Sequence, residues 1–337
     1  MRRAAILGAL LVLLTTTACG GSGMPADELQ LVENPKAAAP ARSPEPDVAP
    51  KGTVLDVDGD VTSVAINQRT RTLAAAVAED DGDAAVLFYP LRRLHAQPRR
   101  VGVEAPVERL TPSGDRFTAT VPSRDTVLYL TPEGVAGETS VAGGPVSVAE
   151  QHGATLVGLR QARSVAVLRD GRQTGRIGGE LGSADQVLVS SGGDAVVLDR
   201  LRSALFTVQT GDGDIGLGLR AGQGATNAVA DDFNRILVVD TRAENLLAFS
   251  LDPLVLRQLY PVPGSPYGIA YDARRHLAWV TLTARNQVVA FDVAGGQPDE
   301  ISRFPTIRQP NEVTVDQRTG TVVVASANGG GIQVIEP

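Results

Sequence analysis

The feature that most constrains this chain of 337 residues is a repeat of about forty residues. Its clearest copies lie at 227–250, 267–292 and 311–336, and each reads as apolar strand, polar turn, strand, turn and strand. Weaker copies share this frame, so that seven first strands end 38 to 45 residues apart, near Asn67, Pro112, Glu150, Ser190, Asp232, Asp272 and Asp316. Repeats of this kind determine the fold before local propensity does.

A period near forty residues with several strands in each copy is typical of β-propeller blades. Runs such as Ile236–Val239 and Val322–Val324 are β-branched and flanked by turn residues, which favours strands. The apolar spacing of three and four that a helical solenoid needs is missing. We therefore predict an all-β, seven-bladed β-propeller over residues 51–337.

The two ends of the repeat region predict how the ring closes. The seventh copy stops at Pro337 after its third strand, while an isolated strand, Thr53–Val57, precedes the first copy. Pairing the two removes an exposed sheet edge. We predict that residues 53–57 form the outer strand of the blade built from 311–336.

The N-terminus has the pattern of an export signal. Arg2 and Arg3 precede an apolar stretch over 4–14, which is too short to span a membrane, and small residues lead to Cys19. This arrangement resembles a bacterial lipobox, with Thr16 where Leu is usual. It predicts a lipoprotein signal peptide over 1–18 and an acyl anchor, including palmitate, on Cys19 at the outer face of the cell membrane. An ordinary secretory signal with a chance cysteine is the alternative.

Residues 19–50 are rich in Pro, Ala and Gly and have no apolar period. Proline opposes helix and favours extended chain. We predict a flexible, disordered tether between Cys19 and the ring. Arginine far exceeds lysine, and Ala and Gly are abundant, which suggests a GC-rich bacterial genome.

The segment 279–292, WVTLTARNQVVAFD, resembles the YVTN repeat of bacterial lactonase-like (YncE-like) propellers. The residues that match the motif or replace its residue by a close substitute are Trp279, Val280, Thr281, Asn286, Val288 and Asp292. Segments 237–250 and 323–336 follow the same frame. The resemblance implies a seven-bladed propeller in a family that includes lactone hydrolases, surface-layer proteins and exported binding proteins, so it implies fold better than function.

Composition excludes several kinds of function. A net charge of −7 disfavours a general nucleic-acid binder, and a single cysteine excludes both an internal disulfide and a site with several thiolates. The sequence has no nucleophile elbow, phosphate-binding loop or dinucleotide fingerprint, and its three histidines are scattered. Acidic clusters at 56–60 and 79–83 offer too few ligands for calcium, so we read them as solvated loops. We predict no cofactor, no metal and no catalytic residue.

Arginine recurs in the second turn of five consecutive repeats, 10 to 13 residues after the end of the first strand, at Arg124, Arg163, Arg202, Arg242 and Arg285. Such turns lie on one face of a propeller. Arginine suits carboxylate or phosphate partners through bidentate hydrogen bonds, although an exposed turn arginine can also be only a solvated residue.

The same face receives the connections that lead into the innermost strands. Tyr267, Asn227, Asn311 and Glu312 are the polar or aromatic residues best placed there, near the mouth of the central channel. Asn227 and Asn311 could also serve only to cap turns. We name these four residues, with the five arginines, as the candidate binding site.

These patterns together predict a monomeric, membrane-anchored binding or scaffold module for an unidentified envelope protein or anionic ligand. The alternative is a lactonase-like hydrolase that uses Glu312, His152 or Arg308 with a water molecule at the channel. A quinone-dependent dehydrogenase is disfavoured because Trp279 is the only tryptophan.

Overall fold

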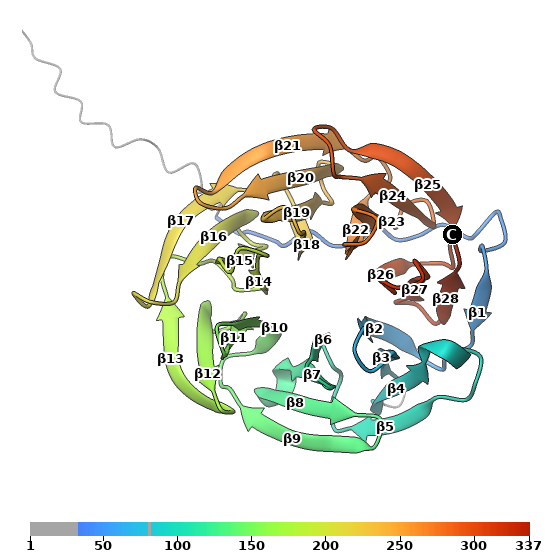
Figure 1. Ribbon diagram of the computed structural model, residues 1–337, viewed down its shortest axis with the longest axis horizontal. Helices are drawn as coiled ribbons and strands as arrows, with labels where there is room; N and C mark the ends of the chain where they lie inside the picture. Colours follow the sequence, from blue (N-terminus) through green and yellow to red (C-terminus); the bar gives the residue numbers. More distant parts are fainter. Residues whose placement is uncertain (1–32, 80–81) are drawn as a thin grey trace, which may run out of the picture.

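Short runs of aliphatic and β-branched residues form 28 strands in this computed structural model, which describes residues 33–79 and 82–337. The strands build seven four-stranded blades around a central axis (Figure 1). Blades 3 and 4 are also joined by one parallel bridge between Gly178 and Asp214. The prediction of an all-β, seven-bladed propeller is confirmed. The signal peptide and Cys19 lie outside the described residues.

Each blade runs from an inner to an outer strand, and its four strands are antiparallel neighbours. Blade 1 has β2 (Asp60–Asn67), β3 (Thr72–Ala78), β4 (Ala84–Pro90) and β5 (Arg99–Val103); blade 2 has β6 (Arg109–Ser113), β7 (Arg116–Val121), β8 (Thr126–Thr131) and β9 (Gly134–Ser140). Blade 3 has β10 (Pro145–Gln151), β11 (Ala154–Leu159), β12 (Ser164–Arg169) and β13 (Arg172–Gly178); blade 4 has β14 (Gln186–Val189), β15 (Ala195–Asp199), β16 (Ala204–Gln209) and β17 (Asp214–Arg220).

Blades 5 to 7 repeat this order. Blade 5 has β18 (Ala225–Ala230), β19 (Arg235–Asp240), β20 (Asn245–Ser250) and β21 (Val255–Pro261); blade 6 has β22 (Pro266–Asp272), β23 (Leu277–Leu282), β24 (Gln287–Asp292) and β25 (Asp299–Pro305). Blade 7 has β26 (Pro310–Val315), β27 (Val322–Ser326), β28 (Ile332–Ile335) and the N-terminal strand β1 (Thr53–Leu55). Two 3-10 turns, η1 (Leu91–Arg93) and η2 (Pro122–Arg124), complete the secondary structure.

The core is divided among the seven interfaces between blades. Each interface holds one cluster of buried apolar side chains, and the clusters together follow the whole ring. Between blades 1 and 2, for example, Phe88 packs against Phe117 with ring centroids 5.7 Å apart. Because every blade is covered on both sides, its three inner strands are largely apolar on both faces, which explains their nearly continuous hydrophobic runs. The outermost strands are mostly exposed or half-buried.

The ring closes through blade 7. β1 pairs with β28 in antiparallel register, with Thr53 opposite Val334 and Leu55 opposite Ile332. The predicted closure is confirmed, although the strand ends at Leu55 rather than residue 57. A second contact joins blades 7 and 1, because the Arg71 guanidinium donates to both carboxylate oxygens of Asp316.

Acidic or amide side chains fix several corners where the innermost strand ends. Asn67, Asp272 and Asp316 accept hydrogen bonds from main-chain N–H groups of the turns that follow them. In blade 5 this role falls to the buried Asp231, which accepts from Phe233 and Arg235 N–H groups, and not to the predicted Asp232.

The chain before the ring behaves differently from the predicted tether. Residues 36–45, called the strap below, run in extended form along one face of blades 4 to 7, where they form the blue trace crossing blades 6 and 5 in Figure 1. Ala38 and Ser43 are buried there. The prediction of a free tether up to residue 50 is therefore wrong for the strap. Its own main-chain atoms make most of its contacts with the ring, and composition does not reveal such contacts.

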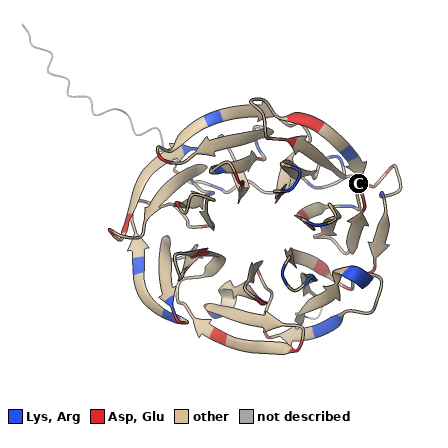
Figure 2. Cartoon of the chain, in the orientation of Figure 1, with Lys and Arg blue, Asp and Glu red and all other residues tan. Residues whose placement is uncertain are grey.

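Across residues 33–79 and 82–337, no helix has the length and apolarity required to cross a bilayer. Charged residues of both signs are spread around the ring (Figure 2).

Candidate functional site

The five predicted arginines lie on one face, which we call the arginine face. They occupy the turns between the second and third strands of blades 2 to 6. The connections between successive blades reach the same face, as the hydrogen bond from Arg242 Nη1 to the carbonyl of Gln223 shows. Each arginine belongs to a different blade, so the structure distributes them around the ring and does not gather them into one cluster.

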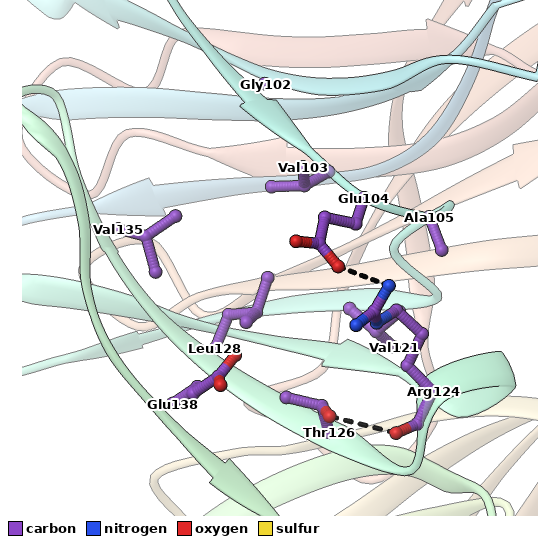
Figure 3. Close-up of a pocket in the computed structure, with 10 residues that line it drawn as sticks. All are labelled: Gly102, Val103, Glu104, Ala105, Val121, Arg124, Thr126, Leu128, Val135 and Glu138. Atoms are coloured by element: carbon purple, nitrogen blue, oxygen red, sulfur yellow. Dashed lines mark hydrogen bonds and ion pairs between the residues drawn. The ribbon is translucent and has the colours of Figure 1, made fainter.

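Arg124 has its own carboxylate partner. It forms an ion pair with Glu104 at the opening of a cavity of about 260 Å³ between blades 1 and 2 (Figure 3). Val103, Leu128 and Val135 supply apolar walls to this cavity. The charge of Arg124 is thereby balanced, which makes it a poor anchor for an external anion.

Three other arginines are engaged locally. The Arg202 guanidinium lies 5.9 Å from the centroid of the Phe206 ring, a cation–π geometry. Arg242 Nη2 donates to the carbonyl of Lys36 in the strap, at 3.2 Å. Arg285 packs against Gly264, where an added Cβ would lie 2.9 Å from its Cδ. The strap thus covers part of the arginine face and leaves the side formed by blades 2 and 3 open.

Arg163 is exposed and lines a cavity of about 440 Å³, which we call the rim cavity. Arg160 and Arg200 lie in its wall, together with Ala37 of the strap. The cavity adjoins the central channel, because two of its residues, Glu108 and Asp185, directly precede channel-lining residues.

The charges in the rim cavity are unequally paired. Arg160 bridges Glu108 at 2.6 Å and Asp185 at 2.7 Å. Burial alone would lower the pKa of Arg160, but these two carboxylates outweigh burial and raise it. Within the described part of the chain, Arg163 and Arg200 form no ion pair, and Arg200 Nη2 donates instead to the carbonyl of Ala38 at 2.8 Å. Two positive charges therefore remain available to an anion.

A second set of polar residues surrounds the channel axis. One position of each innermost strand forms what we call the inner ring, made of Ser63, Arg109, Ser147, Gln186, Asn227, Gly268 and Glu312. In five blades the strand register shifts at or next to this position, which indicates a β-bulge. Bulges re-aim side chains, so they account for polar groups that turn toward the next blade.

Most inner-ring side chains bind the main chain of the next blade. Ser63 Oγ accepts from Leu110 N–H at 3.0 Å, and Ser147 Oγ accepts from Val187 N–H at 2.9 Å. Asn227 Nδ2 donates to the carbonyl of Tyr267 at 3.1 Å. Asn227 and Tyr267 therefore lie in contact, through a bond that also holds two blades in register.

Glu312 and Arg109 are the charged members of the inner ring. They line a channel cavity of about 360 Å³, and Arg109 Nη2 reaches the Oδ1 of Asn227 in blade 5 at 3.1 Å. Burial raises the pKa of Glu312 to about 7, although the charge of Arg109 and the main-chain N–H of Val64 oppose the rise. Asn311, next to Glu312, accepts a hydrogen bond from Gln309 Nε2 at 3.0 Å.

The groups proposed for hydrolysis do not meet. His152 lies in the β10–β11 turn on the opposite face, beside Gly193, while Arg308 lies on the arginine face and pairs with Glu45. His276 also lies on the opposite face, where its Nδ1 is 3.3 Å from Asp232 Oδ2. Glu312 is the only one of the three proposed hydrolase residues that lines the central channel.

Sequence reasoning missed Arg109, Arg160, Arg200 and the strap. Arg109 could have been found by extending the repeat frame, because it stands where Asn227 and Glu312 stand in their blades. Arg160 and Arg200 lie two or three residues before Arg163 and Arg202, so the choice between neighbouring turn residues needed the structure.

Comparison with known proteins indicates fold and not family. No family model matches the chain, and no curated protein matches it. Hydrazine synthase of Kuenenia stuttgartiensis is similar in structure, with a TM-score of 0.69, 14% identity and coverage of 85% of this chain and 98% of that one. A catalytically inactive virginiamycin B lyase from Staphylococcus aureus with quinupristin has a TM-score of 0.70 and 13% identity, over 84% and 98%.

The β-propeller domain of Cps50 (Swd1) from Myceliophteria thermophila is similar to the same degree, with a TM-score of 0.69 and 12% identity over 85% of this chain and 99% of that one. These identities show the fold alone, and the same ring hosts both catalytic and non-catalytic proteins. The YVTN relationship and the acyl anchor stay predictions. The chain is a seven-bladed β-propeller module.

Proposed function

We propose that this protein is an exported, lipid-anchored binding module that holds an anionic group of an envelope component in the rim cavity. The export signal pattern and Cys19 support the location, and the absence of a paired catalytic constellation in the described residues favours binding over catalysis. The ring provides a rigid support on which turn residues keep fixed positions.

The observation that carries this proposal is the pair of arginines without carboxylate partners at the rim cavity. Arg163 is exposed, whereas Arg200 is held in place by Ala38 and by its main-chain N–H bond to Asp185 at 2.9 Å. A carboxylate or phosphate between them would receive charge-assisted hydrogen bonds. The candidate binding surface expected from the sequence, with five arginines, is thus reduced to the rim cavity, where the open side of the face at blade 3 meets blade 4.

Reversing one charge tests this site. We expect Arg163→Glu to weaken capture of the partner from a detergent extract of the cell envelope by about tenfold or more, since one lost charge-assisted hydrogen bond is worth about 1.5–3 kcal/mol. Binding of the wild-type protein should also fall with added salt. Capture is measured by quantitative mass spectrometry on the immobilised full chain.

Arg274→Glu is the matched control, because Arg274 is an exposed turn arginine on the opposite face. It changes net charge equally and should leave capture unchanged. If both variants lose capture equally, the effect is one of net charge alone. If Arg163→Glu captures the partner as well as the wild-type protein does, the rim cavity is not the binding site.

A hydrolase that uses Glu312 is the second candidate, favoured by one observation. Its carboxyl group lies in the channel with a pKa raised to about 7, which suits a general base near neutral pH. If lactones are substrates, turnover should rise as pH passes upward through about 7, because the base acts when deprotonated. Glu312→Gln should lower that turnover by at least about a hundredfold.

A panel of lactones and sugar lactones, followed by pH-stat titration with and without divalent metal, measures this activity. His152→Gln serves as the control, because His152 lies on the opposite face. Turnover that survives Glu312→Gln, or that disappears equally with His152→Gln, would dismiss Glu312 as the base.

A further inference from the structure

The strap is bound mainly through its own main chain. Side chains on the arginine face donate to its carbonyl groups and accept from its N–H groups along blades 4 to 7. The contacts are Arg242 with Lys36 O, Arg200 with Ala38 O, Thr283 Oγ1 with Ala41 N, Gln309 with Ala41 O and Ser43 N, and Asn286 with Pro44 O. Contacts of this kind read an extended backbone and tolerate many side chains.

Gln309 shows this recognition most directly. Its amide nitrogen donates to Ala41 O at 2.9 Å, and its amide oxygen accepts from Ser43 N at 3.0 Å. The side chain thus imitates the edge of a neighbouring β-strand. Thr283 adds two bonds, because its Oγ1 accepts from Ala41 N at 3.1 Å and its carbonyl accepts from Ser43 Oγ at 2.5 Å.

Three strap side chains add selectivity. Ala38 is buried against Gly224, where an added Cβ would lie only 2.8 Å from the Ala38 Cβ, so a small residue is required. The Ser43 hydroxyl both donates to Thr283 O and accepts from Gln309 N–H at 3.1 Å. Glu45 pairs with Arg308 at 2.5 Å.

The strap contributes little to the hydrophobic core. None of the seven interblade clusters in the described chain includes a strap residue, whereas Leu55 of β1 packs against the cluster between blades 7 and 1. Its attachment therefore rests mainly on polar bonds, most of them partly buried, each of which contributes about 1 kcal/mol net. A segment held in this way can leave the ring without unfolding it.

The groove is the surface of blades 4 to 7 that the strap covers, formed by Arg200, Arg242, Thr283, Asn286 and Gln309. We propose that this groove is an exchangeable recognition site for an extended polypeptide segment of a partner protein, and that the strap occupies it as an intramolecular competitor. The partner segment has the strap's pattern: a small residue, a serine or threonine five positions later, and an acidic residue two positions after that. Proline between these positions, as at Pro40 and Pro44, favours the extended form. This proposal does not depend on the anionic ligand proposed for the rim cavity, although the two sites share Arg200.

The test weakens docking of the strap and adds a separate peptide with the strap's sequence. In the full chain, Ala38→Arg combined with Ser43→Val removes the small residue and the hydroxyl while leaving every groove residue intact. The probe is a fluorescein-labelled peptide of residues 34–47. We expect saturable binding to this double variant with a Kd below about 1 mM, measured by fluorescence anisotropy, and at least tenfold weaker binding to the wild-type protein, whose own strap competes.

Controls act on each side of the contact. Adding Gln309→Ala to the double variant should weaken peptide binding at least tenfold. A peptide carrying Ala38→Arg should bind the double variant no better than the unchanged peptide binds the protein with Gln309→Ala. Amide exchange reports on the strap itself, because the Ala41 and Ser43 N–H groups are hydrogen-bonded only while it is docked. Both should exchange at least tenfold faster in the double variant.

Two results would overturn the proposal. If the strap amides exchange freely in the double variant and the peptide still fails to bind at 1 mM, the groove is no site for a separate segment. If the same amides stay protected, the groove does not read the small residue and the serine, and the stated pattern is wrong.

Discussion

Deleting residues 51–58 is expected to lower the melting temperature of the protein by about 10 °C or more. The deletion removes β1 and with it Leu55 and Val57, which pack in the cluster between blades 7 and 1. Burying two aliphatic side chains is worth about 3–5 kcal/mol together, and 1 kcal/mol shifts the melting temperature of a domain this large by about 2–4 °C. The deletion also exposes the edge of β28, which invites association between rings.

Differential scanning calorimetry of the full chain measures this effect, and light scattering follows association. Two substitutions separate closure from the mere loss of eight residues. Leu55→Asp places a charge in the apolar cluster and should reproduce most of the loss, whereas Thr53→Asp at an exposed position of the same strand should cost little. An unchanged melt after the deletion would show that the ring does not depend on β1.

The second large effect concerns the ion pair between blades 1 and 7. Asp316→Asn should destabilise the protein by about 2–3 kcal/mol, because it leaves the partly buried Arg71 without the carboxylate that holds it. Asparagine keeps the oxygen that accepts the turn N–H of Arg318, so the corner itself should survive. Urea unfolding at pH 7 measures the difference in the free energy of unfolding.

The same pair predicts a pH dependence. Burial alone would raise the pKa of Asp316, but the hydrogen bonds from Arg71 and Thr319 outweigh burial and lower it to about 2. A carboxyl group whose pKa is lowered by folding stabilises the protein above its unfolded pKa of about 4 and loses this effect as the pH falls toward 2. The difference between wild type and Asp316→Asn should therefore be full above pH 4 and shrink below it.

Asp272→Asn is the matched control for this pair. Asp272 holds the same corner position in blade 6, but its partner Arg275 belongs to the same turn and is 40% exposed. Its substitution should cost less than that of Asp316, since no contact between blades is lost. A larger loss at Asp272 than at Asp316 would contradict a role of the Arg71–Asp316 pair in closing the ring.

The repeat predicted most of the fold because it reflects a local requirement that every blade satisfies. Four short strands need apolar faces and polar turns at fixed intervals, and this pattern of residue types can be read directly from the sequence. The closing strand was predicted for the same reason, as an incomplete final copy and an isolated first strand. The choice of Asp231 over Asp232 was missed, because adjacent strand residues point in opposite directions and only the final register determines which is buried.

The site was predicted less completely. The alternation of turns predicts that the five arginines lie on one face, but it does not predict which residues they contact. Glu104 lies 20 residues before Arg124, and Lys36 lies 206 residues before Arg242. Such partners meet only when the ring closes, so the sequence could not distinguish the exposed Arg163 from arginines that are already engaged.

The sequence by itself determined the number of blades, the composition of their strands and the position of the closing segment, because hydrophobic periodicity and turn chemistry are local properties of a chain. Tertiary structure alone decided the inner ring, the rim cavity and the docked strap. Each of these depends on main-chain groups and side chains from different blades, and main-chain hydrogen bonds are available to any residue type. Repeat spacing could have indicated the positions of the inner ring, but neither composition nor spacing could predict its contacts, the rim cavity or the docked strap.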